Sequence, residues 1–191
     1  MKKRRKTLWV DTETTGLDPE LQDIWSLAYI IDIDGKVEAD GSMLIRPYNF
    51  DTIQEDALKV GNTTVEELEK IDFTIVDAIR ELKKVWGRYI DKYNKMDKFV
   101  LGGYFVRFDA DMLRAAFKKA GDKYGIGSLC FTPLLDVSAF VAQHVAKFGL
   151  RLPNFKLETV CKHYGIGLEA HDAIEDIRAA RELYILLEGV H

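Results

Sequence analysis

Apolar residues in the first third of the chain fall in short runs that are typical of β-strands. Thr7–Glu13 contains the apolar run Leu8-Trp9-Val10 and predicts a first strand. Two further apolar-rich segments, Ile24–Ile33 and Lys36–Arg46, flank the dipeptide Asp34-Gly35, and such a dipeptide between two runs is a strong hairpin signal. The sequence therefore predicts a three-strand antiparallel meander.

The middle of the chain changes to helical spacing. Thr64–Ile71 predicts a short helix, and a segment of about Thr74–Tyr93 predicts a longer one, because its apolar residues recur every three or four positions. These recurring residues are Ile75, Ala78, Ile79, Leu82, Val85, Trp86 and Tyr89. Phe99–Leu101 then predicts a buried strand, and Asp109–Ala120 predicts a helix that Gly121 stops.

The C-terminal third alternates between strand and helix signals. Leu134–Val137 predicts a short strand followed by a helix to about Lys147, and Lys156–His163 and Asp172–Leu187 predict two more helices. An antiparallel start followed by alternating strands and helices is typical of a mixed α/β sheet covered by helices. Because the sequence has no internal repeat, low-complexity tract or linker, residues 7–191 are expected to form a single domain.

A run of five basic residues, Lys2-Lys3-Arg4-Arg5-Lys6, precedes the first strand, and we interpret residues 1–6 as a basic N-terminal extension. The apolar run behind it stops at Asp11 and is too short for a signal peptide. No apolar stretch approaches the ~20 residues that span a bilayer. Two interpretations of the basic run stay open: a solvated terminus, which we favour, and a contact with a phosphate backbone, which would weaken with salt.

Composition narrows the class of protein. A chain of 191 residues with 47% apolar residues suits one domain with a substantial core. Cys130 and Cys161 are too few and too far apart for a disulfide framework or a zinc site, which favours reduced thiols in a cytoplasmic compartment. The net charge of −4 argues against a broad non-specific coat on DNA. It does not exclude a phosphodiester substrate, because bound divalent cations would place positive charge at the site itself.

Two acidic residues stand at the end of the first predicted strand. If Thr7–Glu13 is a strand, Asp11 and Glu13 face the same side, about 6.6 Å apart along the chain. Two carboxylates held so close raise each other's pKa unless positive charge lies between them, and a divalent cation with oxygen-only ligands is the usual source of that charge. The alternative for an isolated Asp-x-Glu pair is a solvated strand end that leads into a turn.

The segment Gly103–Asp109 places a third carboxylate, that of Asp109, at the start of a predicted helix. Its ordinary interpretation is an N-cap, since an aspartate oxygen there accepts hydrogen bonds from backbone N–H groups. Asp111 would point away from Asp109 on a helix, so the two carboxylates do not easily serve one site.

The segment Ala170–Asp176 holds His171 and Asp176, five residues apart and about 140° around a helix. The two side chains share a site only if His171 lies on the loop or first turn and Asp176 lies on the helix. Ala173, between them, leaves that face open to a bulky group. The alternative is an ordinary helix N-terminus rich in acids, which suits the helix dipole.

Taken together, the three segments have the order and approximate spacing of a known family. Asp-x-Glu at the end of the first strand, Phe-Asp in mid-chain and His-Asp-Ala-Ile-Glu-Asp near the C-terminus resemble the DEDDh 3′–5′ exonucleases, the superfamily of polymerase proofreading subunits, RNase T and oligoribonuclease. The resemblance runs from about Thr7 to Leu187, and its middle motif is the least specific. It implies an α/β, ribonuclease H-like fold, in which an antiparallel three-strand meander is followed by parallel strands and flanked by helices.

The resemblance also implies the chemistry of the site. Asp11, Glu13, Asp109 and Asp176 would be the ligands of two Mg²⁺ or Mn²⁺ ions, and His171 would be the general base that acts on the attacking water. Two such ions, about 3.5–4 Å apart, can stabilise the attacking and leaving oxygens. A histidine with a pKa near about 6.5 can accept the proton at neutral pH. Oxygen-only ligands select hard cations and disfavour zinc.

Substrate contacts follow from the same resemblance. Thr12 and Thr14 would meet the terminal nucleotide, and Leu17 would either wedge against the last base or make a core contact. Many relatives carry His-Asn where this chain has Tyr104-Phe105. An aromatic residue at this place would either stack on a base or pack in the core, and we favour core packing. If stacking occurs, we predict that Tyr104 is the residue that binds the substrate. Asp136 matches an aspartate that many relatives carry ahead of a helix, and its expected role is capping.

The leading hypothesis is a metal-dependent 3′–5′ exonuclease that hydrolyses phosphodiester bonds of DNA, at single-stranded or frayed 3′ ends, and releases nucleoside 5′-monophosphates. The alternatives are an exoribonuclease that trims RNA or short oligoribonucleotides and, less favoured, a non-catalytic nucleic-acid binding module. The expected partners are a nucleic acid with a free 3′ end and a polymerase or other replication or repair proteins, with no membrane involved. The sequence leaves open DNA against RNA, single against double strands, and the oligomeric state.

Overall fold

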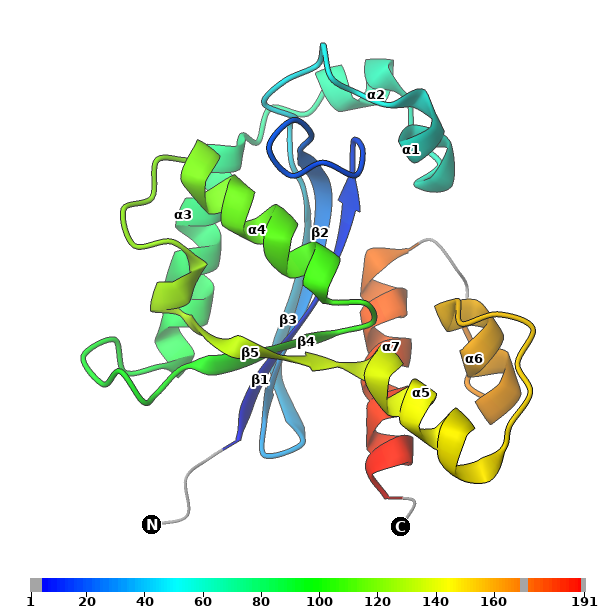
Figure 1. Cartoon of the computed structure of the whole chain (residues 1–191). Helices are drawn as coiled ribbons and strands as arrows, with labels where there is room; N and C mark the ends of the chain where they lie inside the picture. Colours follow the sequence, from blue (N-terminus) through cyan, green and yellow to red (C-terminus); the bar gives the residue numbers. More distant parts are fainter. Residues whose placement is uncertain (1–4, 169–171, 190–191) are drawn as a thin grey trace.

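The structure is a computed structural model that describes residues 5–168 and 172–189. Its centre is a five-stranded sheet in the order β3-β2-β1-β4-β5 (Figure 1). β1 pairs antiparallel with β2 and β2 pairs antiparallel with β3, whereas β4 is parallel to both β1 and β5. The strands are β1 Lys6–Thr14, β2 Ile24–Ile33, β3 Lys36–Leu44, β4 Phe99–Gly103 and β5 Cys130–Asp136. The predicted meander followed by parallel strands is confirmed.

The turn between β2 and β3 follows from two residues. Asp34 and Gly35 have φ angles of 56° and 85°. Positive φ at both central residues is typical of the type I′ turn, whose twist matches that of the flanking strands. The turn sets the register, which pairs Ile33 directly with Lys36.

The helices agree with the apolar spacing in most of the chain. They are α1 Glu55–Val60, α2 Val65–Glu69, α3 Ile75–Trp86, α4 Arg107–Lys119, α5 Val137–Phe148, α6 Leu157–Tyr164 and α7 Ala173–Glu188, with short 3-10 helices η1 Gly87–Tyr89 and η2 Ile126–Ser128. The sequence pattern does not predict α1, which buries only Leu58. The helix predicted over about Thr74–Tyr93 is too long. The α-helix α3 ends at Trp86, with Gly87 as its C-cap, and the 3-10 helix η1 follows it. Among the described residues, no helix is long and apolar enough to cross a membrane.

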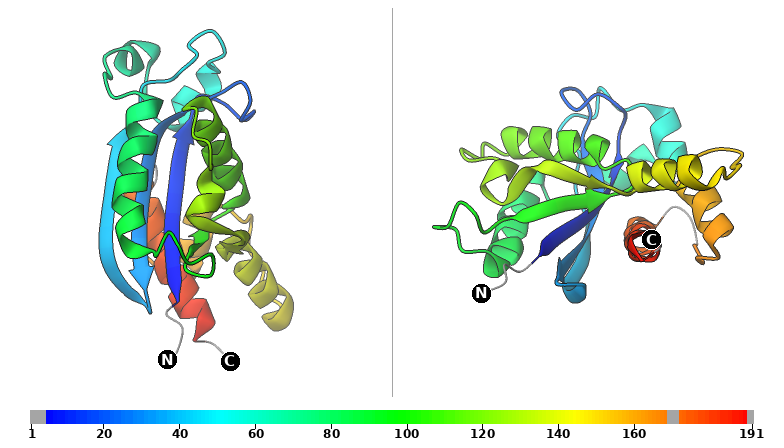
Figure 2. Two further views of the ribbon diagram at one scale, coloured as in Figure 1. Left: turned by 90° about the vertical axis from the view of Figure 1, so that its left-hand side faces the viewer. Right: turned by 60° about the horizontal axis from the view of Figure 1, so that its bottom comes forward.

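The sheet is covered on both faces (Figure 2). Leu8 and Val10 of β1 pack in a core shared with α3 and α4, whereas Trp9 packs in a second core shared with α5, α6 and α7. Strand side chains alternate between faces, so Asp11 and Glu13 lie on the Trp9 side, with α7. The fold thereby brings the end of β1 next to the C-terminal helix.

The N-terminal end of β1 is held by ion pairs. Lys6, which belongs to β1, has its ammonium 2.6 Å from an Asp97 carboxylate oxygen, and Arg5 lies 2.8 Å from Glu188. These two members of the basic run therefore have carboxylate partners. The four residues before them lie outside the described part of the chain.

Candidate metal centre and active site

Three of the predicted acids come together at the end of β1. Asp11, Glu13 and Asp176 each offer a carboxylate oxygen, and these oxygens lie within 4.8 Å of one another. Asp11 and Glu13 are opposite Ala28 and Ser26 in the ladder with β2, two positions apart on one face. Asp176 reaches them from the first turn of α7, a helix that Asp172 caps by accepting a hydrogen bond from the Ile174 N–H at 3.1 Å. We refer to Asp11, Glu13 and Asp176 as the acidic cluster.

Like charges and burial dominate the electrostatics of the acidic cluster. Burial, followed by the carboxylates of Asp109, Asp176 and Glu13, raises the pKa of Asp11 well above its usual range. Every one of these influences opposes the ionised form of the carboxyl group. The Asp11 carboxyl group therefore lies among groups that favour its neutral form.

The carboxylate of Asp109 also raises the pKa of Asp11, but Asp109 belongs to a different element, α4. It is the third residue of α4, whose N-cap is Val106, so the N-cap interpretation of Asp109 is wrong. Its side chain is buried, and the Thr12 hydroxyl donates a hydrogen bond to its Oδ1 at 2.7 Å. Burial raises the pKa of Asp109 to about 7, while the bond from Thr12 acts in the opposite direction. Asp109 thus lies beside the acidic cluster without belonging to the set of oxygens within 4.8 Å.

A divalent cation fits these residues. The donors of the acidic cluster are carboxylate oxygens only, the ligand type that Mg²⁺ and Mn²⁺ prefer. A cation among them would reverse the influences that raise the pKa of Asp11. The donor set and its electrostatics therefore agree with a hard metal ion at the end of β1.

The predicted general base, His171, lies outside the described residues, as does Ala170. The residues that follow it are described: Asp172 caps α7, and Ala173 is 5% exposed. Asp176 lies in the first turn of α7, as a site that it shares with His171 requires. The role of His171 stays a prediction.

The predicted substrate-binding residues divide into buried and exposed ones. Thr12 and Thr14 are both 8% exposed, and the Thr14 hydroxyl donates to the Gly16 carbonyl at 2.8 Å. Leu17 is 76% exposed, so the core contact considered for it is wrong. The wedge interpretation of Leu17 stays a prediction.

Tyr104 and Phe105 differ from each other. The Tyr104 hydroxyl donates to the Phe155 carbonyl at 2.6 Å and its ring is half-buried, whereas Phe105 is 53% exposed. Core packing is therefore confirmed for Tyr104, which packs against the second core, but it does not describe Phe105. Asp136 caps α5 as predicted: its Oδ1 accepts from the Ser138 N–H at 3.0 Å, and also from the Phe105 N–H at 3.2 Å.

The end of α1 is a part of the site that sequence reasoning missed. A Cβ added at Gly61 would lie 3.3 Å from Oε2 of Glu13 and 2.5 Å from Cζ2 of Trp25. Asn62, next in the chain, has a φ of 50°. The Gly-Asn pair is a turn signal, but only the packing of α1 shows that the turn lies against Glu13.

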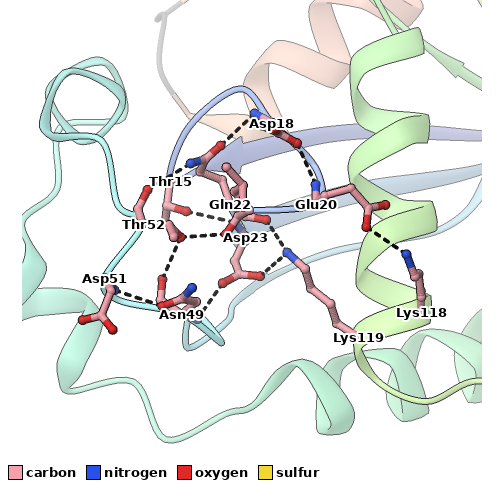
Figure 3. A network of polar contacts seen from close by, with 11 residues as sticks. Thr15, Asp18, Glu20, Gln22, Asp23, Asn49, Asp51, Thr52, Lys118 and Lys119 are labelled. Atoms are coloured by element: carbon pink, nitrogen blue, oxygen red, sulfur yellow. Dashed lines mark hydrogen bonds and ion pairs between the residues drawn. The ribbon is translucent and has the colours of Figure 1, made fainter.

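A second group of polar side chains fixes the loop that follows β1 (Figure 3). Asp23, 5% exposed, accepts from the Lys119 ammonium at 2.8 Å and from the Asn49 N–H at 2.8 Å. Its own N–H donates to the Thr15 hydroxyl at 2.9 Å. Gln22 extends the network by donating to the Thr52 carbonyl at 3.0 Å. We refer to these residues as the Asp23 network.

Comparison with known proteins supplies the context of this site. The RNase_T family model, described as an exonuclease, matches residues 8–184. Proteins described as DNA polymerase III PolC-type, from Thermotoga petrophila and Thermotoga maritima, are each 24% identical over 177 residues, which is 92% of this chain and 11% of theirs. This chain thus spans about a tenth of those relatives.

Solved structures share the fold. Exonuclease I of E. coli, in complex with a dT13 oligonucleotide, superposes with a TM-score of 0.78 at 21% identity, over 97% of this chain and 41% of that chain. Exonuclease I from Methylocaldum szegediense gives a TM-score of 0.76 at 17% identity, over 98% and 41% of the two chains. The sheet and helices described above are therefore those of the exonuclease fold.

Proposed function

The chain belongs to the RNase_T exonuclease family, and from that membership we propose that it is a metal-dependent 3′–5′ exonuclease that hydrolyses phosphodiester bonds of DNA. Single-stranded or frayed 3′ ends are the proposed substrates, and nucleoside 5′-monophosphates are the proposed products. The observation that carries the proposal is the acidic cluster, whose three carboxylates lie within 4.8 Å of one another at the end of β1.

In this proposal the carboxylates of Asp11, Glu13, Asp109 and Asp176 would hold two Mg²⁺ or Mn²⁺ ions. When bound, such ions supply the positive charge that stabilises the phosphodiester as negative charge develops on it. Asp109 is kept in place for this role by the Thr12 hydroxyl, which donates to its Oδ1 at 2.7 Å. Three of the four proposed ligands thus have carboxylate oxygens within 4.8 Å of one another.

His171 is proposed to accept the proton of the attacking water on its imidazole. The water oxygen forms a bond to phosphorus, and the bond from phosphorus to the 3′ oxygen of the preceding nucleotide breaks. That oxygen takes up a proton, so the shortened strand ends in a 3′ hydroxyl and the terminal nucleotide leaves as a 5′-monophosphate. A general base of this kind contributes about 10²- to 10⁴-fold to a rate. The position of His171, just before the α7 cap Asp172, supports this role, because Asp176 of the acidic cluster lies one turn further along the helix.

DNA is the proposed substrate because the similar structure of E. coli Exonuclease I holds a dT13 oligonucleotide. The PolC-type relatives support a place in replication or repair, beside a polymerase. The discriminating experiment digests single-stranded DNA, duplex DNA and RNA of one sequence, with Mg²⁺ and with EDTA. We expect shortening from the 3′ end of single-stranded DNA with Mg²⁺ only. Faster shortening of RNA would support the exoribonuclease, and binding without any shortening would support a non-catalytic module.

The role of His171 has its own test. In His171→Ala we expect the hydrolysis rate to fall by about 10²- to 10⁴-fold while Mn²⁺ still binds, because the imidazole moves a proton and holds no metal. The rate is measured with a 3′-labelled oligonucleotide, and Mn²⁺ binding by calorimetry. Loss of Mn²⁺ binding would instead make His171 a ligand.

A further inference from the structure

The turn between β4 and α4 holds a bulky aromatic residue in a backbone conformation that such residues rarely adopt. Phe105 has a φ of 55°, in the left-handed region. Among the described non-glycine residues, only Asp34 and Asn62 share a positive φ, and Asp and Asn are the residue types that tolerate it. Phe105 is therefore the one member of this group whose side chain does not suit its backbone.

The surrounding structure imposes this conformation from both sides. The Phe105 N–H donates to Oδ1 of Asp136 at 3.2 Å, and its carbonyl accepts from the Phe108 N–H at 3.1 Å. Val106 is fully buried, and a Cβ on Gly103 would lie 2.8 Å from the Val10 carbonyl oxygen. The turn is thus packed directly on β1, one residue before Asp11. Strained backbone persists where neighbours determine it in this way, and such positions gather at functional sites.

Burial does not offset the strain. The ring of Phe105 is 53% exposed, and its aromatic contact is with the ring of Tyr104, at 4.9 Å between centroids and 78° between planes. Tyr104 is itself anchored by the hydrogen bond from its hydroxyl to the Phe155 carbonyl. An asparagine would adopt this φ more easily and would be better solvated. Packing therefore gives no reason for a phenylalanine here, whereas a ligand would.

A nucleobase is the ligand that fits a flat, exposed ring at this place. Phe105 stands four residues before Asp109, on a turn that lies against β1 one residue before Asp11, and this turn is where a strand that reaches the acidic cluster would meet an exposed ring. Base–aromatic stacking tolerates any sequence, because every base has a π-face. Tyr104, whose hydroxyl is hydrogen-bonded, contacts the Phe105 ring in a T-shaped arrangement.

We propose that Phe105 forms a base-stacking subsite for one nucleobase near the 3′ end of the bound strand, with Tyr104 as the residue that positions its ring. This inference rests on the proposed function. The proposal assigns to Phe105 the stacking role that the sequence predicts for Tyr104.

The test uses a substitution that suits the backbone. Phe105→Asn removes the ring and relieves the left-handed strain, so its melting temperature should equal or exceed that of the wild type. We expect KM for a single-stranded oligonucleotide to rise on the order of ten- to a hundredfold in Phe105→Asn, with kcat changed much less. Phe105→Trp, which keeps an aromatic face, should restore KM to within a few fold. Tyr93→Asn is the matched control, because Tyr93 is 86% exposed and lies in the segment that precedes β4, whereas Phe105 follows β4.

A series of oligonucleotides with one abasic site at successive positions from the 3′ end locates the subsite. Binding is measured by fluorescence anisotropy in EDTA, so that no turnover is needed. The wild type should lose affinity at one position, and Phe105→Asn should lose nothing more there. An unchanged affinity of Phe105→Asn for the intact strand, or the same abasic penalty in both proteins, overturns the subsite. A wild type that binds through Phe105 yet never shortens the strand with Mg²⁺ would contradict the proposed function and support the subsite.

Discussion

The Asp23 network and the acidic cluster flank the end of β1, and they place carboxylates in opposite electrostatic surroundings. In the Asp23 network, Asp23 accepts from the Lys119 ammonium and from a backbone N–H (Figure 3). In the acidic cluster, Asp11 has Glu13 and Asp176 as neighbours, and every influence on its pKa raises it. The Asp23 carboxylate is thus paired with a cation of the chain, whereas the Asp11 carboxyl group lies among other carboxylates.

The difference separates a structural role from a functional one. A buried carboxylate that is paired and hydrogen-bonded holds two segments together, here the loop after β1 and the end of α4. A half-buried carboxylate beside other carboxylates experiences a repulsion that a bound cation would relieve. We therefore expect mutations to separate the groups: the acidic cluster should govern activity, and the Asp23 network should govern stability.

The largest expected effect is on activity in the acidic cluster. In Asp11→Ala and in Asp176→Ala, Mg²⁺-dependent hydrolysis should fall by about a thousandfold or more, because metal assistance contributes several kcal/mol. The free energy of unfolding in EDTA should stay the same or increase, since a half-buried carboxylate that other carboxylates repel is removed. The measurements are shortening of a labelled oligonucleotide and urea denaturation.

Asp111→Ala is the matched control for activity, because Asp111 pairs on the surface of α4 with Arg107 and Arg114. It should retain hydrolysis within about twofold. Wild-type hydrolysis in Asp11→Ala would contradict the metal-site assignment.

The next effect is on stability in the Asp23 network. Lys119→Met leaves the Asp23 carboxylate buried without its cation, and breaking such a pair costs about 3–5 kcal/mol of unfolding free energy. Lys118→Met is the control one residue away, since Lys118 and Glu20 pair at 2.8 Å with side chains 71% and 70% exposed. That change should stay within about 0.5 kcal/mol. Adding Asp23→Asn to Lys119→Met should recover part of the lost unfolding free energy. Equal losses of unfolding free energy in Lys119→Met and Lys118→Met would contradict the distinction between the buried and the exposed ion pair.

The smallest expected effect is a pH dependence of the metal-free protein. Burial raises the pKa of Asp109 to about 7 in the folded state, against about 3.9 in an unfolded chain. The folded state then binds more protons between these values, so this group makes the unfolding free energy fall as the pH rises from about 4 to about 7. Urea denaturation in EDTA across this range should show the fall, and the fall should be shallower in Asp109→Asn, where only the raised pKa of Asp11 still contributes to it. The same slope in both proteins would assign the pH dependence to other groups.

Local patterns in the sequence predict most of the fold. The Asp34-Gly35 turn and the capped start of α3 at Thr74 depend on neighbouring residues only, and both are where the sequence places them. The sequence does not predict α1, because its N-cap, Gln54, makes no side-chain capping bond and the helix buries a single side chain. The overlong helix prediction arises because Tyr89 continues the apolar spacing of α3 through the 3-10 turn after Gly87.

The candidate site is predicted in part for the same reason. The sequence alone determines that Asp11 and Glu13 share a face, because side chains alternate along any strand. It also places Asp172 at the start of α7 and Asp176 within its first turn, since capping is local.

Only the tertiary structure decides which of these residues meet. Asp176 joins the acidic cluster because α7 packs on β1 across more than 150 residues of chain, and Asp109 accepts from Thr12, 97 residues away. Phe105 adopts its left-handed backbone because the Asp136 carboxylate, 31 residues on, accepts from its N–H. Such contacts depend on how the whole sheet and its helices pack, and no local pattern in the sequence encodes them.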